Sequence, residues 1–181
     1  MTTVSLARLV SCLVASSAAA SAVIAAVDAE RNARGRGALG VVDKAGGGSS
    51  SSGSGWDPQT EADRGAERAV VDAVRREFPL LTVVGEESGL QAEAQPHERA
   101  GAPAPGQGEP AHAPLLPELA AFAGSVGDVV DARRVAVFVD PLDGTKEFTE
   151  GRLEFVTVLL GATLDGVAVA GVVAEPFSKR V

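Results

Sequence analysis

Apolar residues recur at helical spacing in one segment and form a short, mostly apolar run in the next. Between Thr60 and Phe78 they return every three or four positions, which predicts an amphipathic helix. Thr60 can cap the start of this helix together with Asp63, and Pro79 ends it. The run Leu80–Val84 then predicts a short buried strand.

The second half of the chain predicts more strands than helices. Val135–Val139 is an apolar run without polar alternation, as in a buried strand. Phe155–Ala162 and Val167–Ala174 predict an antiparallel hairpin, because Asp165-Gly166 between them suits a tight turn. Leu115–Val130 predicts a helix. The expected fold is therefore a mixed α/β (α+β) layered domain, with a mostly antiparallel sheet flanked by helices.

The apolar N-terminal segment Leu9–Val27 allows more than one interpretation. Five serines between Ser5 and Ser21 argue against a membrane span. We favour a buried alanine-rich helix that ends at the charges of Asp28–Arg31, in a cytoplasmic protein. The alternative is a transit signal for a plastid or mitochondrion.

Two stretches cannot contribute to a core. Residues 46–55 are almost entirely Gly and Ser, and residues 91–117 are rich in Pro, Gly and Ala. Both compositions predict flexible insertions. The 181 residues otherwise fit a single domain.

Composition excludes several classes of function. The net charge of −8 and the pI of about 4.8 argue against nucleic-acid binding, which normally needs a basic surface. The single cysteine, Cys12, allows no internal disulfide. His97 and His112 lie in the Pro-rich stretch, so a zinc site of the usual His/Cys type is not expected.

Acidic residues follow two of the predicted strands. Glu86 and Glu87 end one strand, and Asp140 and Asp143 end another. Strands that end at the same sheet edge bring such carboxylates together, and a hard divalent cation can neutralise them. The Leu142 carbonyl can point the same way as both aspartates, which adds a third oxygen ligand.

The residues after the aspartates suit phosphate binding. Gly144 permits a tight turn, and Thr145 opens a short helical turn whose exposed N–H groups attract anions. Each acidic pair alone is commonly a solvated surface feature. Asp63 alone is most simply a helix cap. A buried strand running into Asp140-Pro-Leu-Asp-Gly-Thr145 is a much rarer combination.

Three segments resemble signatures of the inositol monophosphatase superfamily. Val139–Gly151 is similar to its metal-binding signature, Val84–Ser88 to its partner motif, and Thr60–Arg64 to an upstream motif with a catalytic aspartate. Lys146-Glu147 is typical of the bisphosphate nucleotidases within this superfamily. The resemblance covers most of the chain outside the two insertions.

The resemblance implies a magnesium site of two or three ions. Glu86, Asp140 and the Leu142 carbonyl would hold one ion. Asp140 and Asp143 would help to hold a second, and Glu87 would support the site.

It also implies roles for the neighbouring residues. Asp63 and Thr145 would orient the water that attacks phosphorus, and the backbone of Gly144 and Thr145 would grip the phosphate. The family has a further metal-binding aspartate in a C-terminal Trp-Asp motif. The one Trp-Asp pair here, Trp56-Asp57, precedes the first motif, so we expect the C-terminal half of the fold to be missing.

The implied substrate is a small-molecule phosphate ester, with neither nucleic acid nor membrane as a partner. The nucleotidase resemblance favours removal of the 3'-phosphate of adenosine 3',5'-bisphosphate, or of its sulfated form, with inhibition by lithium. An inositol phosphate is the alternative substrate. A third alternative is a catalytically incomplete fragment that only binds metal or a partner.

Overall fold

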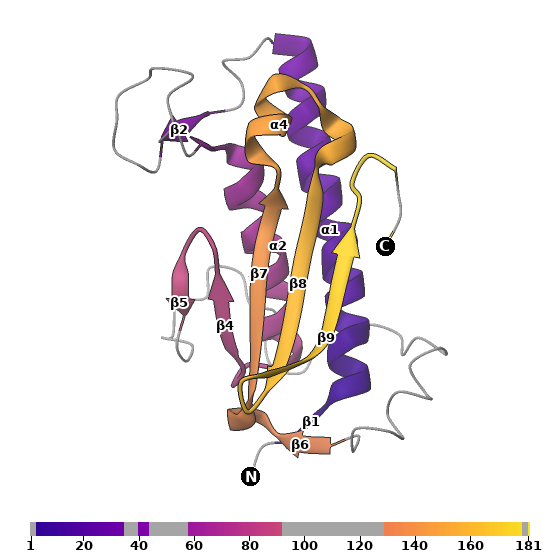
Figure 1. Cartoon of the computed structure of the whole chain (residues 1–181), viewed down its shortest axis with the longest axis vertical. Helices are drawn as coiled ribbons and strands as arrows, with labels where there is room; N and C mark the ends of the chain where they lie inside the picture. The colour runs from indigo at the N-terminus through magenta and orange to yellow at the C-terminus, as the bar shows by residue number, and fades with distance from the viewer. Residues whose placement is uncertain (1–2, 35–39, 44–57, 92–128, 179–180) are drawn as a thin grey trace, which may run out of the picture.

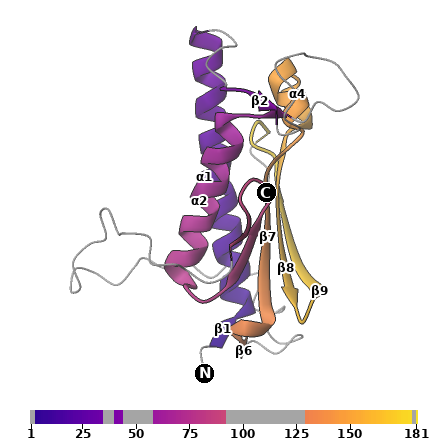
Figure 2. The same cartoon turned by 90° about the vertical axis from the view of Figure 1, so that its left-hand side faces the viewer.

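Two long helices cover one face of a five-stranded sheet. The computed structural model describes residues 3–34, 40–43, 58–91, 129–178 and 181. Helices α1 (Leu6–Arg34) and α2 (Glu61–Glu77) lie side by side behind the sheet (Figure 1). The view from the side separates a helical layer from a sheet layer (Figure 2).

The sheet has the strand order β5-β4-β7-β8-β9. Its strands are β4 (Thr82–Gly85), β5 (Gly89–Gln91), β7 (Val135–Asp143), β8 (Thr157–Leu164) and β9 (Val167–Ala174). β4 and β7 run parallel, and the other neighbouring pairs run antiparallel. The mixed α/β class with a mostly antiparallel sheet is confirmed.

Smaller elements complete the described part of the chain. The short helix α4 (Thr145–Glu150) follows β7 directly. β1 (Thr3–Ser5) pairs with β6 (Val129–Asp131), and β2 (Val42–Asp43) pairs with β3 (Pro58–Gln59). Two 3-10 turns, η3 (Ala132–Arg134) and η4 (Leu153–Phe155), flank β7 and β8.

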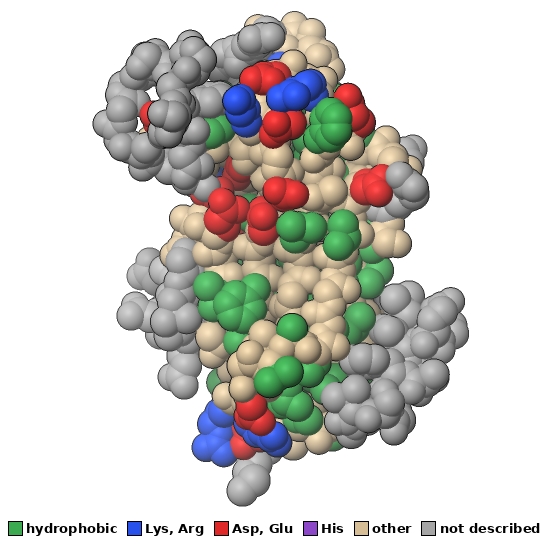
Figure 3. Space-filling view, in the orientation of Figure 1, with side chains coloured by type: hydrophobic (Ala, Val, Ile, Leu, Met, Phe, Trp, Pro, Cys, Tyr) green, Lys and Arg blue, Asp and Glu red, His purple; other side chains and the backbone are tan. Residues whose placement is uncertain are grey.

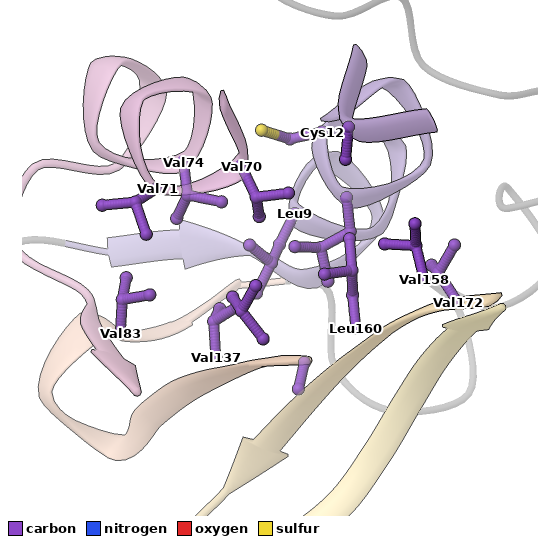
Figure 4. Close-up of a cluster of buried hydrophobic side chains, with 14 of the residues drawn as sticks. Leu9, Cys12, Val70, Val71, Val74, Val83, Val137, Val158, Leu160 and Val172 are labelled. Atoms are coloured by element: carbon purple, nitrogen blue, oxygen red, sulfur yellow. The ribbon is translucent and has the colours of Figure 1, made fainter. Parts of the chain in front are cut away.

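The core lies between the helical layer and the sheet. Leu9 of α1 and Val70 of α2 point toward Val137 of β7 and Leu160 of β8 (Figure 4). All four side chains are almost completely buried. Burial of this apolar surface is the main force that holds the two layers together. It places the N-terminal part of α2 beside the C-terminal ends of β4 and β7.

The prediction for α2 is confirmed in detail. Thr60 is the N-cap, and its side chain accepts hydrogen bonds from the N–H groups of Ala62 and Asp63. Asp63 in turn accepts the N–H of Thr60 at 2.8 Å, which completes a capping box. The helix ends at Glu77, two residues before Pro79.

The first helix exists but is longer than predicted. α1 does not end at the Asp28–Arg31 charges; it continues to Arg34. Asp28 is buried and forms an ion pair with Arg31 one turn later. Because the charges neutralise each other within the helix, they do not end it.

By length and composition α1 could cross a membrane. Its most apolar 18-residue window has a mean hydropathy of 2.1, and 44% of that window is buried inside the fold. A core helix of a globular domain meets the same criteria. Here α1 packs against α2, β8 and β9, so its apolar residues have an explanation within the domain.

Several boundaries differ from the predictions. Val129 and Val130, expected in a helix, belong to β6, and Gln91, expected to open a loop, ends β5. Phe155 lies in η4, so β8 begins two residues late. The Asp165-Gly166 turn is confirmed, with positive φ at both residues. The predicted insertions at residues 46–55 and 92–117 lie outside the described residues. Residues 115–128 of the predicted helix lie outside them as well.

Candidate metal-binding and active site

The parallel pairing of β4 with β7 brings the first two carboxylates together. Gly85 is the register partner of Val139, and the Glu86 N–H donates to the Val139 carbonyl at 2.9 Å. Glu86 therefore leaves β4 beside Asp140, and the two carboxyl groups are within hydrogen-bonding reach. The expected convergence of these strand ends is present.

Asp140 is electrostatically unusual for an aspartate. Burial, together with the neighbouring Glu86 and Asp143 carboxylates, raises the pKa of Asp140 to about 7. Its Oδ1 atom is buried and has no hydrogen-bond partner in the described part of the chain. A buried carboxylate oxygen without a donor, next to another carboxylate, suits a hard cation such as Mg²⁺.

A bulge in β7 sets the direction of the two aspartates. Residues three apart on a regular strand point to opposite faces. Here Asp140 pairs with Leu159 and Asp143 with Thr157, so β7 has one residue more than β8 in this interval. Pro141 occupies the bulge, where its missing N–H costs no ladder hydrogen bond. The extra residue allows Asp140 and Asp143 to share the outer side of the sheet.

Asp143 has a partner that the sequence did not reveal. The Thr157 hydroxyl donates to Asp143 Oδ2 at 3.0 Å. Thr157 opens β8 directly opposite Asp143. Its contribution depends on strand register, which the sequence alone does not define.

The Thr145 hydroxyl connects α2 with the end of β7. It lies 2.9 Å from Asp63 Oδ1 and 3.0 Å from the Leu142 carbonyl oxygen. A hydroxyl has one proton. When it donates to Asp63, the Leu142 carbonyl is free to coordinate a cation.

Asp63 is therefore both a cap and part of the site. Its side chain is 1% exposed. Burial raises the pKa of Asp63, while hydrogen bonds from Thr60 and Thr145 oppose this shift. The Thr60 hydroxyl and N–H hold Oδ2, so Oδ1 remains directed to Thr145.

Gly144 is required by its surroundings. Its φ of +86° lies in the left-handed region, and an added Cβ would stand 2.8 Å from the Phe155 carbonyl oxygen. Gly144 also directly precedes α4, and its carbonyl accepts the Phe148 N–H at 2.9 Å. It is the N-cap of α4, so the predicted helical start next to the aspartates is confirmed.

Glu87 makes protein contacts through one carboxylate oxygen and through its backbone N–H. Its carboxylate accepts a hydrogen bond from the Gln59 amide, and its N–H donates to Glu67 Oε2 at 2.8 Å. Gln59 is held in turn by Arg64 at 2.8 Å. This arrangement agrees with a supporting role for Glu87. Glu67 could have been noticed as an acid within the apolar face of α2, whereas nothing in the sequence pointed to Gln59.

The described acids do not make a complete cation site by themselves. Within the described ranges no three His, Cys, Asp or Glu side chains are grouped to hold an ion by themselves. The predicted first ion needs two, Glu86 and Asp140, together with the Leu142 carbonyl. Acidic side chains gather on this face, with apolar side chains over the sheet below them (Figure 3). An open apolar depression beside the acids includes Phe138 and Leu159.

The fold and the site define a layered α/β protein with acidic strand ends suited to hard cations and phosphate esters. A model of the inositol monophosphatase family matches residues 9–181, so the chain belongs to that family. The match includes most of α1, which agrees with its position in the core. Phosphatases of this family are generally magnesium-dependent.

Curated relatives include both nucleotidases and inositol phosphatases by name. The chain is 36% identical over 129 residues to human 3'(2'),5'-bisphosphate nucleotidase 1, a match that covers 67% of this chain and 36% of the relative. It is 33% identical over 149 residues to the rat protein of that name, covering 78% and 40%. It is 29% identical over 120 residues to zebrafish inositol monophosphatase 3, covering 66% and 31%. The chain thus spans well under half of these relatives.

A solved structure supports the fold. The extragenic suppressor protein suhB from Bartonella henselae superposes with a TM-score of 0.60 at 20% identity, covering 94% of this chain and 46% of that one. At this identity the likeness concerns the fold alone.

Proposed function

We propose that this chain carries the metal-binding part of a magnesium-dependent phosphomonoesterase that removes the 3'-phosphate of adenosine 3',5'-bisphosphate. The convergence of Glu86 and Asp140 at one sheet edge is the observation that carries the proposal. The preference for a nucleotide rests on the relatives named as bisphosphate nucleotidases and on Lys146-Glu147 after the Asp-Gly-Thr segment.

The donor set fits magnesium. Glu86, Asp140 and the Leu142 carbonyl would hold one ion, and Asp140 with Asp143 would contribute to a second. The observation that supports this fit is the buried Oδ1 of Asp140, which has no hydrogen-bond partner among the described residues. Magnesium bound there would stabilise negative charge on the phosphoryl oxygens.

Asp63 and Thr145 supply the proton chemistry. With its proton directed to Asp63 Oδ1, the Thr145 oxygen presents lone pairs that can accept a hydrogen bond from an attacking water. As the water attacks phosphorus, its proton passes to the Thr145 oxygen and the Thr145 hydroxyl proton passes to Asp63 Oδ1. The raised pKa of Asp63 makes it a stronger base than an exposed aspartate. The N–H groups at Gly144 and Thr145 would orient the phosphate.

An inositol phosphate is the second candidate substrate. The relatives named inositol monophosphatase 3 favour it. Hydrolysis of either substrate would use the same carboxylates of the site. The two reactions differ only in the alcohol that is released with the phosphate.

Phosphate release under magnesium tests the proposal. We expect this chain to release phosphate from adenosine 3',5'-bisphosphate faster than from inositol 1,4-bisphosphate, and Asp140→Asn to abolish both rates. Asp131→Asn is the matched control, because this half-buried aspartate of β6 lies at the opposite end of β7 from the site. Faster release from the inositol ester would favour the second candidate, and no release from either would favour a catalytically incomplete fragment.

A further inference from the structure

Glu67 is a buried acid on the face of α2 that meets the sheet. It lies one helical turn after Asp63, and its exposed fraction is 5%. A carboxylate so deeply buried is costly unless it makes specific polar contacts. Its contacts therefore indicate what the residue does.

Those contacts fall on both sides of Glu86. Glu67 Oε2 accepts the Glu87 N–H at 2.8 Å. The same carboxyl group packs on Gly85, where an added Cβ would stand 2.5 Å from Glu67 Cδ. The Glu86 N–H itself is held by the Val139 carbonyl of β7. The turn that carries Glu86 is thus attached to α2 through its neighbours and to β7 through its own backbone.

We propose that Glu67 is a positioning residue for Glu86. It anchors the turn Gly85–Glu87 to α2, so that the Glu86 carboxylate stays directed toward Asp140. The inference rests on the proposed function, because it assigns to Glu67 the support of one ligand in the proposed magnesium site. Gly85 is the complementary half of this contact, since any side chain there would displace the Glu67 carboxyl.

Glutamine is the informative replacement. Its amide oxygen can still accept the Glu87 N–H, so Glu67→Gln preserves the anchor. Glu67→Ala removes the anchor. Loss of a group that orients a metal ligand typically weakens metal binding about 10- to 100-fold.

The experiment measures magnesium affinity by calorimetry, without substrate. We expect Glu67→Ala and Gly85→Ala each to weaken binding at least about tenfold, and Glu67→Gln to stay near the wild-type value. The double variant Gly85→Ala/Glu67→Ala should bind no more weakly than Glu67→Ala, because the methyl group then has room. Such non-additivity is expected for residues in contact and not for distant, independent sites.

Val70→Ala is the control for general destabilisation. Val70 lies on the same helix and is fully buried, so the variant lowers the melting temperature without touching the turn. We expect its magnesium affinity to be unchanged. The Glu87 amide should also exchange with solvent faster in Glu67→Ala than in Val70→Ala.

Two results would overturn the inference, and they are distinguishable. If the wild-type chain binds magnesium and Glu67→Ala binds it equally well, the positioning role is wrong and the proposed metal site stands. If the wild-type chain binds no magnesium, the proposed site fails and the role of Glu67 fails with it.

Discussion

The Thr145 hydroxyl and Asp63 Oδ1 lie 2.9 Å apart although 82 positions separate them in the chain. Thr145 begins α4, and Asp63 lies in the first turn of α2. Their contact therefore joins the helical layer to the end of β7. It gives Asp63, which is otherwise a capping residue, a route to the proposed reaction.

Removal of the Thr145 hydroxyl should reduce turnover without removing the metal site. Thr145→Val keeps the shape of the side chain but has no hydroxyl proton to transfer to Asp63. We expect kcat for phosphate release to fall about 100- to 10,000-fold, the usual range for lost acid–base assistance. Thr145→Ser retains a hydroxyl and should keep most of the rate. A Thr145→Val variant as active as Thr145→Ser would contradict the role of this pair.

The raised pKa of Asp140 predicts how stability depends on pH in the absence of metal. The folded pKa of about 7 exceeds the ordinary value of 3.8, so the folded state binds the proton more tightly than the unfolded state. Stability should therefore fall as the pH rises from about 4 to about 7, and level off above. Magnesium should restore it at pH 8.

Melting temperatures in a chelator check this dependence. Other groups also titrate, so the informative quantity is the difference between wild type and Asp140→Asn. Asp140→Asn should lose part of the decline between pH 4 and 7 and most of the stabilisation by magnesium. Identical pH profiles for the two proteins would show that Asp140 has an ordinary pKa.

Arg31 should matter for stability far more than a neighbouring arginine on the same helix. Its guanidinium pairs with buried Asp28, donates to the Phe148 carbonyl at 2.6 Å and stacks on the Phe148 ring at 5.5 Å. Arg31→Met removes the counter-ion of buried Asp28 and leaves it the hydrogen bond from the Asn32 amide at 3.2 Å. Loss of one partner of a buried ion pair typically costs about 3–5 kcal/mol.

The exposed pair of Arg34 and Glu30 supplies the control. These side chains are 74% and 62% exposed and stand 4.0 Å apart, so Arg34→Met should change the free energy of unfolding by less than about 1 kcal/mol. Urea unfolding measures both variants. Equal effects would mean that the Arg31 contacts contribute nothing beyond a surface ion pair.

Local patterns predicted the elements that depend on nearby residues. The capping of α2 by Thr60, the turn at Asp165-Gly166 and the strand before Asp140 follow from spacing and turn chemistry. These three features could be predicted because they form without contacts to residues distant in the chain. The expected acidic strand ends also converge, since two consecutive motifs each end a strand at the same edge.

Long-range packing accounts for what the sequence did not reveal. α1 passes the Asp28–Arg31 charges because these two residues pair with each other, and Arg31 also contacts Phe148 of α4, 117 positions away. β6 forms only by pairing with β1 at the other end of the chain. The bulge at Pro141 and the partners Thr157, Gln59 and Glu67 depend on register and on the contact of α2 with β4.

The proposed magnesium site can be located by anomalous diffraction from a crystal of this chain soaked in Mn²⁺, because manganese takes the oxygen ligands of magnesium and is located without reference to activity. We expect a peak within bonding distance of the Glu86 and Asp140 carboxylates and the Leu142 carbonyl, and no such peak in Asp140→Asn crystals. A wild-type crystal with no peak there, and with Glu86 turned away from Asp140, would contradict the proposed site.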